Sequence, residues 1–350
     1  MNPEPGRPES QPAIASSLPA DPHNPLAPAN LPAHSGSSET YFPPVPVRDL
    51  DESDLGPPQR RRVVPLVLFL LTCFFTYAAG AYHWKIVWFA TNPQTGDPWS
   101  VAQTWKQLTA NWQDGLVYML CVMSVLLAHE MGHFLMTVRY KVPASYPIFL
   151  PMPLMFTGTM GAVIGMEGFR ANRRQMFDIG LAGPLAGLVL TIPMVWIGIK
   201  MAQPIAHQPD DLIFGDPMLA KMLMHWLRPD MPANSVFKNP VYMAGWVGMF
   251  VTGLNMMPVS QLDGGHVIYA LFLKRGHYIA RAFLLAAMTF VIVSGQVSWT
   301  AMLVIITLLG VDHPPTSDDR IPLGFTRTVL GLLSLVLPVL CFTPFRLHTG

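Results

Sequence analysis

The sequence predicts an all-α polytopic membrane protein, with about six to seven transmembrane helices and a re-entrant loop or β-hairpin near the active site. Of its 350 residues, 51% are hydrophobic and 12% are charged, whereas about a quarter of the residues are charged in an ordinary soluble domain. Long apolar stretches recur along the chain, and one of them carries two histidines and a glutamate. The apolar stretch that follows is interrupted by prolines and glycines, which predicts the non-helical part.

Two regions differ sharply in composition. Residues 1–62 contain 14 of the 35 prolines and have no periodic apolar pattern, so we expect a disordered, proline-rich tail. Residues 63–350 form the expected membrane-embedded domain, with its core at residues 115–272. Arg60, Arg61 and Arg62 adjoin the first apolar stretch, and positive charge stays on the cytoplasmic side, so the N-terminus is predicted to be cytoplasmic.

The expected membrane spans follow from the lengths of the apolar stretches, since about 20 apolar residues cross a bilayer as a helix. The seven stretches are, approximately, residues 63–82, 115–138, 179–199, 241–272, 279–295, 297–311 and 324–344. The near-neutral net charge of +1 gives no reason to expect a nucleic-acid partner.

The stretch at 115–138 contains His129-Glu130-Met-Gly-His133. On a helix the two histidines share a face, so both imidazoles can reach one metal ion, with Glu130 beside them. This H-E-x-x-H pattern is typical of zinc peptidases. The alternatives are a polar network in the core or a chance match, but unpaired ionisable groups are costly inside a membrane. The sequence therefore predicts a metal site at bilayer depth.

The stretch after this motif cannot form one regular helix. It contains Pro143, Pro147, Pro151 and Pro153, then Gly158, Gly161 and Gly165. Irregular backbone at membrane depth occurs only where protein or a water-filled cavity covers it. We therefore expect a re-entrant loop or hairpin beside the metal, where a strand edge could pair with an unwound substrate backbone.

The expected span at 179–199 carries a helix-packing pattern. Gly183 and Gly187 form a small-x-x-x-small face, which lets another helix come close. Asp178 stands just before the span and is expected to cap it.

A second polar string, at residues 255–266, interrupts the fourth expected span. Pro258 removes a helical hydrogen bond, and the glycines after Asp263 loosen the backbone. A carboxylate here needs a partner, and a zinc ion held by two histidines can take it as third ligand, leaving one position for water. The alternatives are that Asp263 caps a half-helix, or that His266 is the third ligand.

The two motifs, H-E-x-x-H at 129–133 and N-x-x-P-x-x-x-L-D-G at 255–264, together resemble the site-2 protease family of intramembrane zinc metalloproteases. Their order, the membrane setting and the intervening Gly183-Pro184 match over about residues 63–315. The resemblance implies one zinc ion per chain bound by His129, His133 and Asp263, with Glu130 as the catalytic base.

The resemblance also carries expectations for other residues and for location. In the family the asparagine of the second motif, Asn255 here, lies near the active site, which implies a part in substrate binding or charge stabilisation. The branch with chloroplast members and their bacterial relatives is the most similar one, so we expect a multi-pass protein of the bacterial plasma membrane. His313 could approach the site, although a loop histidine is more often solvated.

The implied function is cleavage of a peptide bond in the transmembrane segment of a protein substrate, within the lipid bilayer. Two alternatives remain: a membrane metal transporter, which also places His and Asp in membrane helices, and a catalytically silent membrane-binding relative. The sequence does not indicate the substrate, the regulatory trigger or the oligomeric state.

Overall fold

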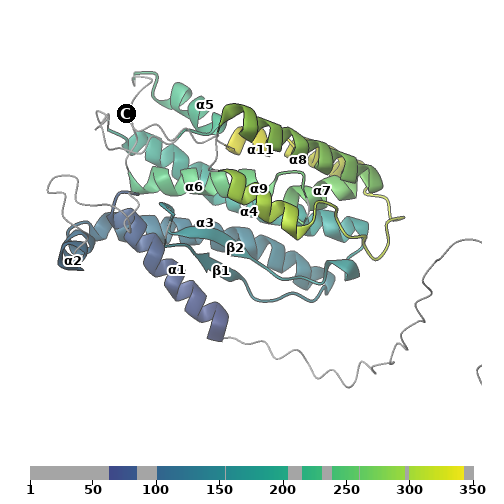
Figure 1. The fold of residues 1–350 in the computed structure, drawn as a ribbon, viewed down its shortest axis with the longest axis horizontal. Helices are drawn as coiled ribbons and strands as arrows, with labels where there is room; N and C mark the ends of the chain where they lie inside the picture. Colours follow the sequence, from purple (N-terminus) through teal and green to yellow (C-terminus); the bar gives the residue numbers. More distant parts are fainter. Residues whose placement is uncertain are drawn as a thin grey trace, which may run out of the picture. The chain divides into compact units, whose positions relative to one another are not determined.

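The computed structural model is mostly helical and contains one small sheet (Figure 1). It describes residues 63–84, 101–153, 155–203, 215–230, 239–259, 261–295 and 299–342. Its elements are α1 (Val63–Ala81), α2 (Val101–Ala110), α3 (Trp112–Tyr140), β1 (Ile148–Pro151), β2 (Thr159–Val163), the 3-10 helix η2 (Gly168–Arg170), α4 (Arg173–Met201), α5 (Met218–Leu227), α6 (Pro240–Asn255), α7 (Asp263–Phe272), α8 (Lys274–Ser294), α9 (Thr300–Leu309), α10 (Phe325–Ser334) and α11 (Leu337–Cys341). The predicted tail at 1–62 lies outside the described residues.

Four helices in the described ranges are long and apolar enough to cross a membrane: α1, α3, α4 and α8. This agrees with a polytopic membrane protein but does not confirm six to seven spans. The expected span at 241–272 is divided into α6 and α7, with residues 256–262 between them. Each half is too short to cross a bilayer alone, because a span needs about 20 helical residues.

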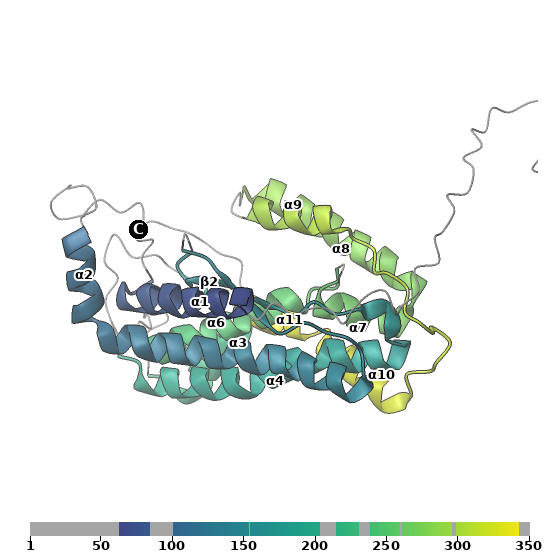
Figure 2. The same cartoon turned by 90° about the horizontal axis from the view of Figure 1, so that it is seen from below.

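Helices α3 and α4, with 29 residues each, pack side by side (Figure 2). Helix α4 also packs against α6 and α7, so it contacts every helix that carries a predicted site residue. It remains helical through Pro184 and Pro193. Proline is tolerated in such helices because neighbouring helices and polar side chains satisfy the freed backbone groups.

The start of α4 corrects one prediction. The helix begins at Arg173, where Asn172 and Gln175 form a reciprocal capping box with both hydrogen bonds at 3.0 Å. Asp178 therefore lies inside the helix and does not cap it. Its carboxylate instead accepts two hydrogen bonds from Arg327 of α10, at 2.7 and 2.9 Å, and one from the hydroxyl of Tyr140.

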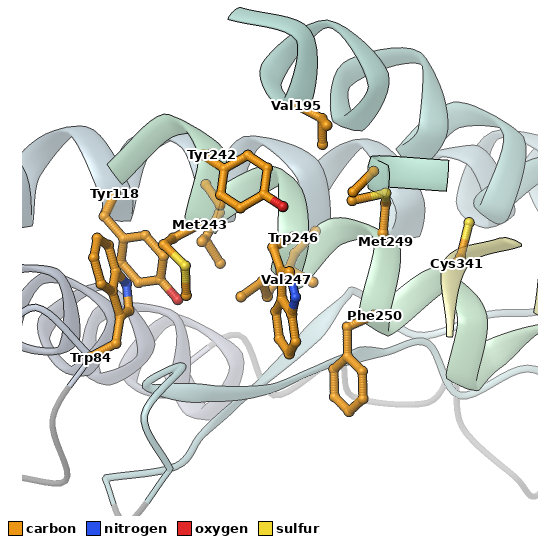
Figure 3. Packing of buried hydrophobic residues seen from close by; sticks show 14 of the residues in the cluster. Trp84, Tyr118, Val195, Tyr242, Met243, Trp246, Val247, Met249, Phe250 and Cys341 are labelled. Atoms are coloured by element: carbon orange, nitrogen blue, oxygen red, sulfur yellow. The ribbon is translucent and has the colours of Figure 1, made fainter. Parts of the chain in front are cut away.

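The largest buried apolar cluster surrounds α6 (Figure 3). Trp246 and Phe250 stack with their ring centroids 5.4 Å apart, and Tyr242 lies on the same helix. From other parts of the chain, Trp84 and Tyr118 meet edge to face at 5.6 Å. Large aromatic side chains bury much apolar area, so this cluster fixes α6 against α3 and α4.

Strands β1 and β2 form an antiparallel pair in the proline- and glycine-rich stretch. Ile148 lies opposite Val163 and Leu150 opposite Gly161, and the register shifts between Leu150 and Pro151. The expected hairpin is thus present, packed against α1. In the described part of the chain β2 pairs with β1 alone, so its other edge has no strand beside it.

Candidate metal centre

Helix α3 presents the three residues of the first motif at one place. His129 and Glu130 are buried, with exposed fractions of 3% and 4%, and the rings of His129 and His133 lie 4.9 Å apart. The four-residue spacing brings both imidazoles onto one face, as predicted. Ionisable side chains at this depth require partners.

The carboxylate of Asp263, on α7, is the partner of both histidines. Its Oδ2 lies 3.1 Å from Nε2 of His129, and its Oδ1 lies 3.3 Å from Nε2 of His133. The two Nε2 atoms are 3.2 Å apart. His129, His133 and Asp263 are the group that could hold a metal ion among the described residues.

These separations fit zinc. Nitrogen and oxygen ligands lie about 2.0–2.2 Å from Zn²⁺, so two ligands of a tetrahedral ion are about 3.3 Å apart. Nε2 of His129 also has polar neighbours on three residues at 3.1–3.2 Å, although one ring nitrogen makes one hydrogen bond. A cation shared by these groups accounts for their convergence, and three protein ligands leave a fourth position for water.

The carbonyl of Ile179 orients one of the imidazoles. Nδ1 of His133 lies 2.7 Å from this oxygen, which can only accept, so Nδ1 carries the proton and Nε2 keeps its lone pair. Metal-bound histidines are commonly held through the second ring nitrogen in this way.

Glycines on α4 make room for the imidazoles. A Cβ atom at Gly183 would overlap Nε2 of His133, and one at Gly187 would lie 3.3 Å from Nδ1 of His129. The predicted close approach of another helix is thus present, and that helix is α3. The glycine pattern did not indicate that the space at these glycines is filled by histidine rings.

The break between α6 and α7 places Asp263 beside α3. Helix α6 ends at Asn255, the described residues 256–259 and 261–262 are not helical, and Asp263 begins α7. Gly264 is needed at this break, because a Cβ there would overlap the carbonyl of Met256. At the other end of α7, Arg173 donates hydrogen bonds to the carbonyls of Ala270 and Leu271, at 2.7 and 3.2 Å.

Asn255, predicted near the active site, lies at the end of α6 with Nδ2 3.2 Å from Nε2 of His129. Its amide therefore faces the ligand atoms. An amide N–H at this place can donate to an oxygen that gains negative charge in a reaction.

A cavity of about 140 Å³ opens at the ligand atoms. Its walls come from α3, from residues 162–164 of the hairpin, and from the segment 261–266. Residues of the hairpin thus line the same cavity as the helices that hold the candidate ligands.

The structure separates the alternatives that the sequence left open for two histidines. His266 is not part of the metal-binding group, although it lines the cavity. His313 is not solvated: its exposed fraction is 6%, and its Nε2 lies 2.6 Å from Nδ1 of His266. The sequence contains both histidines, 47 residues apart, but no pattern in it indicated that they meet.

The sequence profile described as Peptidase family M50 matches residues 117–295, just over half of the chain and the whole of the site described above. The chain belongs to this family, the site-2 proteases. Membership agrees with the four apolar helices, one of which, α3, carries His129 and His133.

Several plant proteins are similar to this M50 chain. "Probable zinc metalloprotease EGY1, chloroplastic" of Oryza sativa subsp. japonica is 30% identical over 297 residues, which are 81% of this chain and 50% of that protein. The protein of the same name from Arabidopsis thaliana is 28% identical over 295 residues, 81% of this chain and 53% of its own length. The chain thus spans about half the length of the relatives it matches.

Proposed function

We propose that this M50 chain is an intramembrane zinc metalloendopeptidase that cleaves a peptide bond in a transmembrane segment of another protein. The observation that carries the proposal is a buried glutamate, Glu130, next to a group of three ligands whose separations fit zinc. A transporter or a silent relative has no need of this carboxylate, whereas hydrolysis needs a proton acceptor there.

His129, His133 and Asp263 would hold one zinc ion. When bound, the ion supplies a Lewis acid that lowers the pKa of water toward neutrality and polarises a peptide carbonyl. Glu130 takes the proton of the attacking water and passes it to the leaving amine nitrogen. The amide of Asn255 donates a hydrogen bond to the carbonyl oxygen as it gains charge.

The substrate is proposed to be a single membrane-spanning segment that unwinds locally, because a helical peptide bond hides its carbonyl from attack. Residues 162 and 163 of β2 line the cavity, and the unpaired edge of β2 can accept an extended peptide as an added strand. Strand addition predicts that N-methylation of the substrate backbone weakens binding at alternate residues, since every second N–H faces the partner strand.

The position in the cell also belongs to this proposal. A cytoplasmic N-terminus rests on Arg60–Arg62, which lie outside the described residues. The relatives named above are chloroplastic plant proteins, so they do not support the bacterial plasma membrane that we expected, and the kind of membrane stays a prediction.

Cleavage of a panel of fluorescently tagged single-span substrates in detergent tests the proposal, with the wild type beside Glu130→Gln and the zinc content measured for both. We expect the wild type to cut and the variant to be inactive, by roughly a thousand-fold or more. Both should hold about one zinc ion per chain, because Glu130 is not a ligand.

The combination of zinc content and cleavage separates the alternatives. A protein that holds zinc and transports it in proteoliposomes without cutting any substrate would support the transporter. A wild type without zinc would contradict the metal site itself.

A further inference from the structure

The segment 311–322, which follows α9, is fixed to three helices near the cavity. Ser317 donates its backbone N–H to the carbonyl of Ala171 at 2.9 Å. The backbone N–H of Arg173 donates to the carbonyl of Asp318 at 3.2 Å. Tyr269 of α7 donates its hydroxyl to Asp319 at 2.7 Å, and Arg281 of α8 pairs with Asp312. The segment therefore holds a defined position beside α7.

This position buries His313 against α7. The ring of His313 stacks on Tyr269 with centroids 4.4 Å apart and planes 17° from parallel. Its Nε2 lies 2.6 Å from Nδ1 of His266, and its Nδ1 contacts the carbonyl oxygen of Pro314. Both nitrogens of His313 are thus engaged.

The contacts determine where the protons lie. Burial lowers the pKa of His313 to about 4, so this ring is neutral at pH 7 and carries one proton. A carbonyl can only accept, so that proton is on Nδ1, which donates to Pro314. Nε2 of His313 is therefore an acceptor, and Nδ1 of His266 must donate to it.

A neutral His266 with its proton on Nδ1 has a bare nitrogen at Nε2. Because Nδ1 is directed to His313, Nε2 is the ring nitrogen left for the cavity that His266 lines. We propose that His266 is a substrate-binding residue, fixed by His313 in this tautomer so that its Nε2 accepts a backbone N–H of the bound peptide. This inference deepens the proposed function and rests on it.

The type of ligand follows from the acceptor. An unwound peptide in a membrane exposes backbone N–H groups, each of which is costly to leave unpaired, and Nε2 can pair one of them. A carbonyl of the peptide would need a donor instead. A proton relay through the two histidines is disfavoured, because the chain of hydrogen bonds ends at the carbonyl of Pro314.

Binding of a synthetic peptide tests the inference without cleavage. The probe is a fluorescein-labelled helix of about 20 apolar residues with a central Gly-Pro pair, in lipid nanodiscs. The protein is the zinc-loaded full chain with Glu130→Gln, so that bound peptide stays intact. A second series of probes replaces single amide links near the Gly-Pro pair by esters, which removes one N–H at a time.

Three variants in the Glu130→Gln background test the two roles separately: that of His266 as the acceptor and that of His313 in fixing its tautomer. His266→Asn keeps a donor to His313 but has no acceptor at the position of Nε2, because its side chain is shorter. His313→Phe keeps the stacking on Tyr269 but removes the acceptor that fixes the tautomer. We expect each to raise Kd by roughly three- to tenfold, the effect of one hydrogen bond. His313→Gln should rescue, since its amide oxygen can accept from His266.

For the parent protein, one ester probe should have a Kd that is roughly three- to tenfold higher than that of the amide probe. For the His266→Asn variant, this ester probe and the amide probe should have the same Kd. If both His266→Asn and His313→Phe bind like the parent, or if no ester position depends on residue 266, the inference is wrong. Cleavage of the same peptide by the protein with Glu130 intact is measured in a separate experiment, which tests the proposed protease activity. Weaker binding without cleavage in the wild type would support the binding role and contradict the protease, and an absence of peptide binding would overturn both.

Discussion

The two ends of helix α4 use glycine for different purposes. At Gly183 the missing Cβ makes room for the imidazole of His133, a side chain of the proposed metal centre. At Gly198 it makes room for the backbone of Tyr242, because an added Cβ would lie 2.6 Å from that residue's nitrogen. One glycine admits a functional ring, and the other admits the first turn of a neighbouring helix.

The surroundings differ in the same way. Near Gly198, the side chain of Asn239 caps α6 and also donates to the carbonyl of Gly198 at 2.8 Å, next to the aromatic cluster around Trp246. Near Gly183, the neighbour is the imidazole of His133, whose Nε2 faces the carboxylate of Asp263 at 3.3 Å. Similar close packing therefore stabilises the fold at one end and positions chemical groups at the other, and the two effects should be separable by mutation.

The largest effect is expected for Gly183→Ala. The methyl group would displace His133 from the position where it faces Asp263, so zinc content should fall from about one per chain to near zero. Cleavage should fall by roughly a thousand-fold or more with it. Zinc analysis and the single-span substrate assay measure both.

Gly187→Ala is the matched control, since a methyl group there meets His129 at 3.3 Å and a small shift accommodates it. It should retain zinc. If Gly183→Ala binds zinc as well as the wild type does, the two glycine sites do not differ in the way described.

Gly198→Ala should lower the stability of the fold and leave the zinc content unchanged. Its methyl group would press on the backbone of Tyr242, which cannot move without separating α4 from α6, and such overpacking costs about 1–3 kcal/mol of unfolding free energy. Thermal unfolding in detergent should show a lower Tm, while the folded protein still holds zinc. Loss of zinc at an unchanged Tm would reverse the assignment of the two ends.

Arg327→Met tests how far the functional end depends on polar contacts. The carboxylate of Asp178, whose side chain is 12% exposed, would lose two hydrogen bonds, which should cost about 1–3 kcal/mol of unfolding free energy. Arg281→Met removes the exposed ion pair with Asp312, and exposed pairs contribute little. Chemical denaturation of the two variants should rank them in that order.

Tyr242→Phe should have a small effect, and it tests the part of the molecule next to Gly198. It removes the hydroxyl that donates to Asp216 at 2.6 Å and leaves the ring in the apolar cluster, so the loss should be about 1 kcal/mol. Zinc content and cleavage by the folded protein should match the wild type. A catalytic defect at unchanged stability would show that this end is not purely structural.

The sequence predicted the features that depend on local spacing. Four-residue spacing brought His129 and His133 together, and the residues around Pro258 predicted a break before Asp263. The Gly183–Gly187 face predicted that another helix comes close to α4, without indicating which one. Each follows from helix geometry or from the backbone chemistry of one short segment.

Features that depend on distant partners were not predictable in the same way. Asp178 has the composition of a cap, but Asn172 takes that role, and the partner Arg327 lies 149 residues away. His313 is buried because the segment 311–322 folds back on α7, which no local pattern specifies. The number of spans is also open, because α6 and α7 are shorter than the apolar stretch that contains them.

Helix α7 combines two charges that match its own dipole. Asp263 stands in its first turn, where the exposed N–H groups favour an anion, and the guanidinium of Arg173 closes its last carbonyls, where a cation is favoured. Both ends of this ten-residue helix are thus stabilised by charge. Because Arg173 belongs to the start of α4, the carboxylate of the candidate metal group stands on a helix whose far end is fixed to α4 by hydrogen bonds.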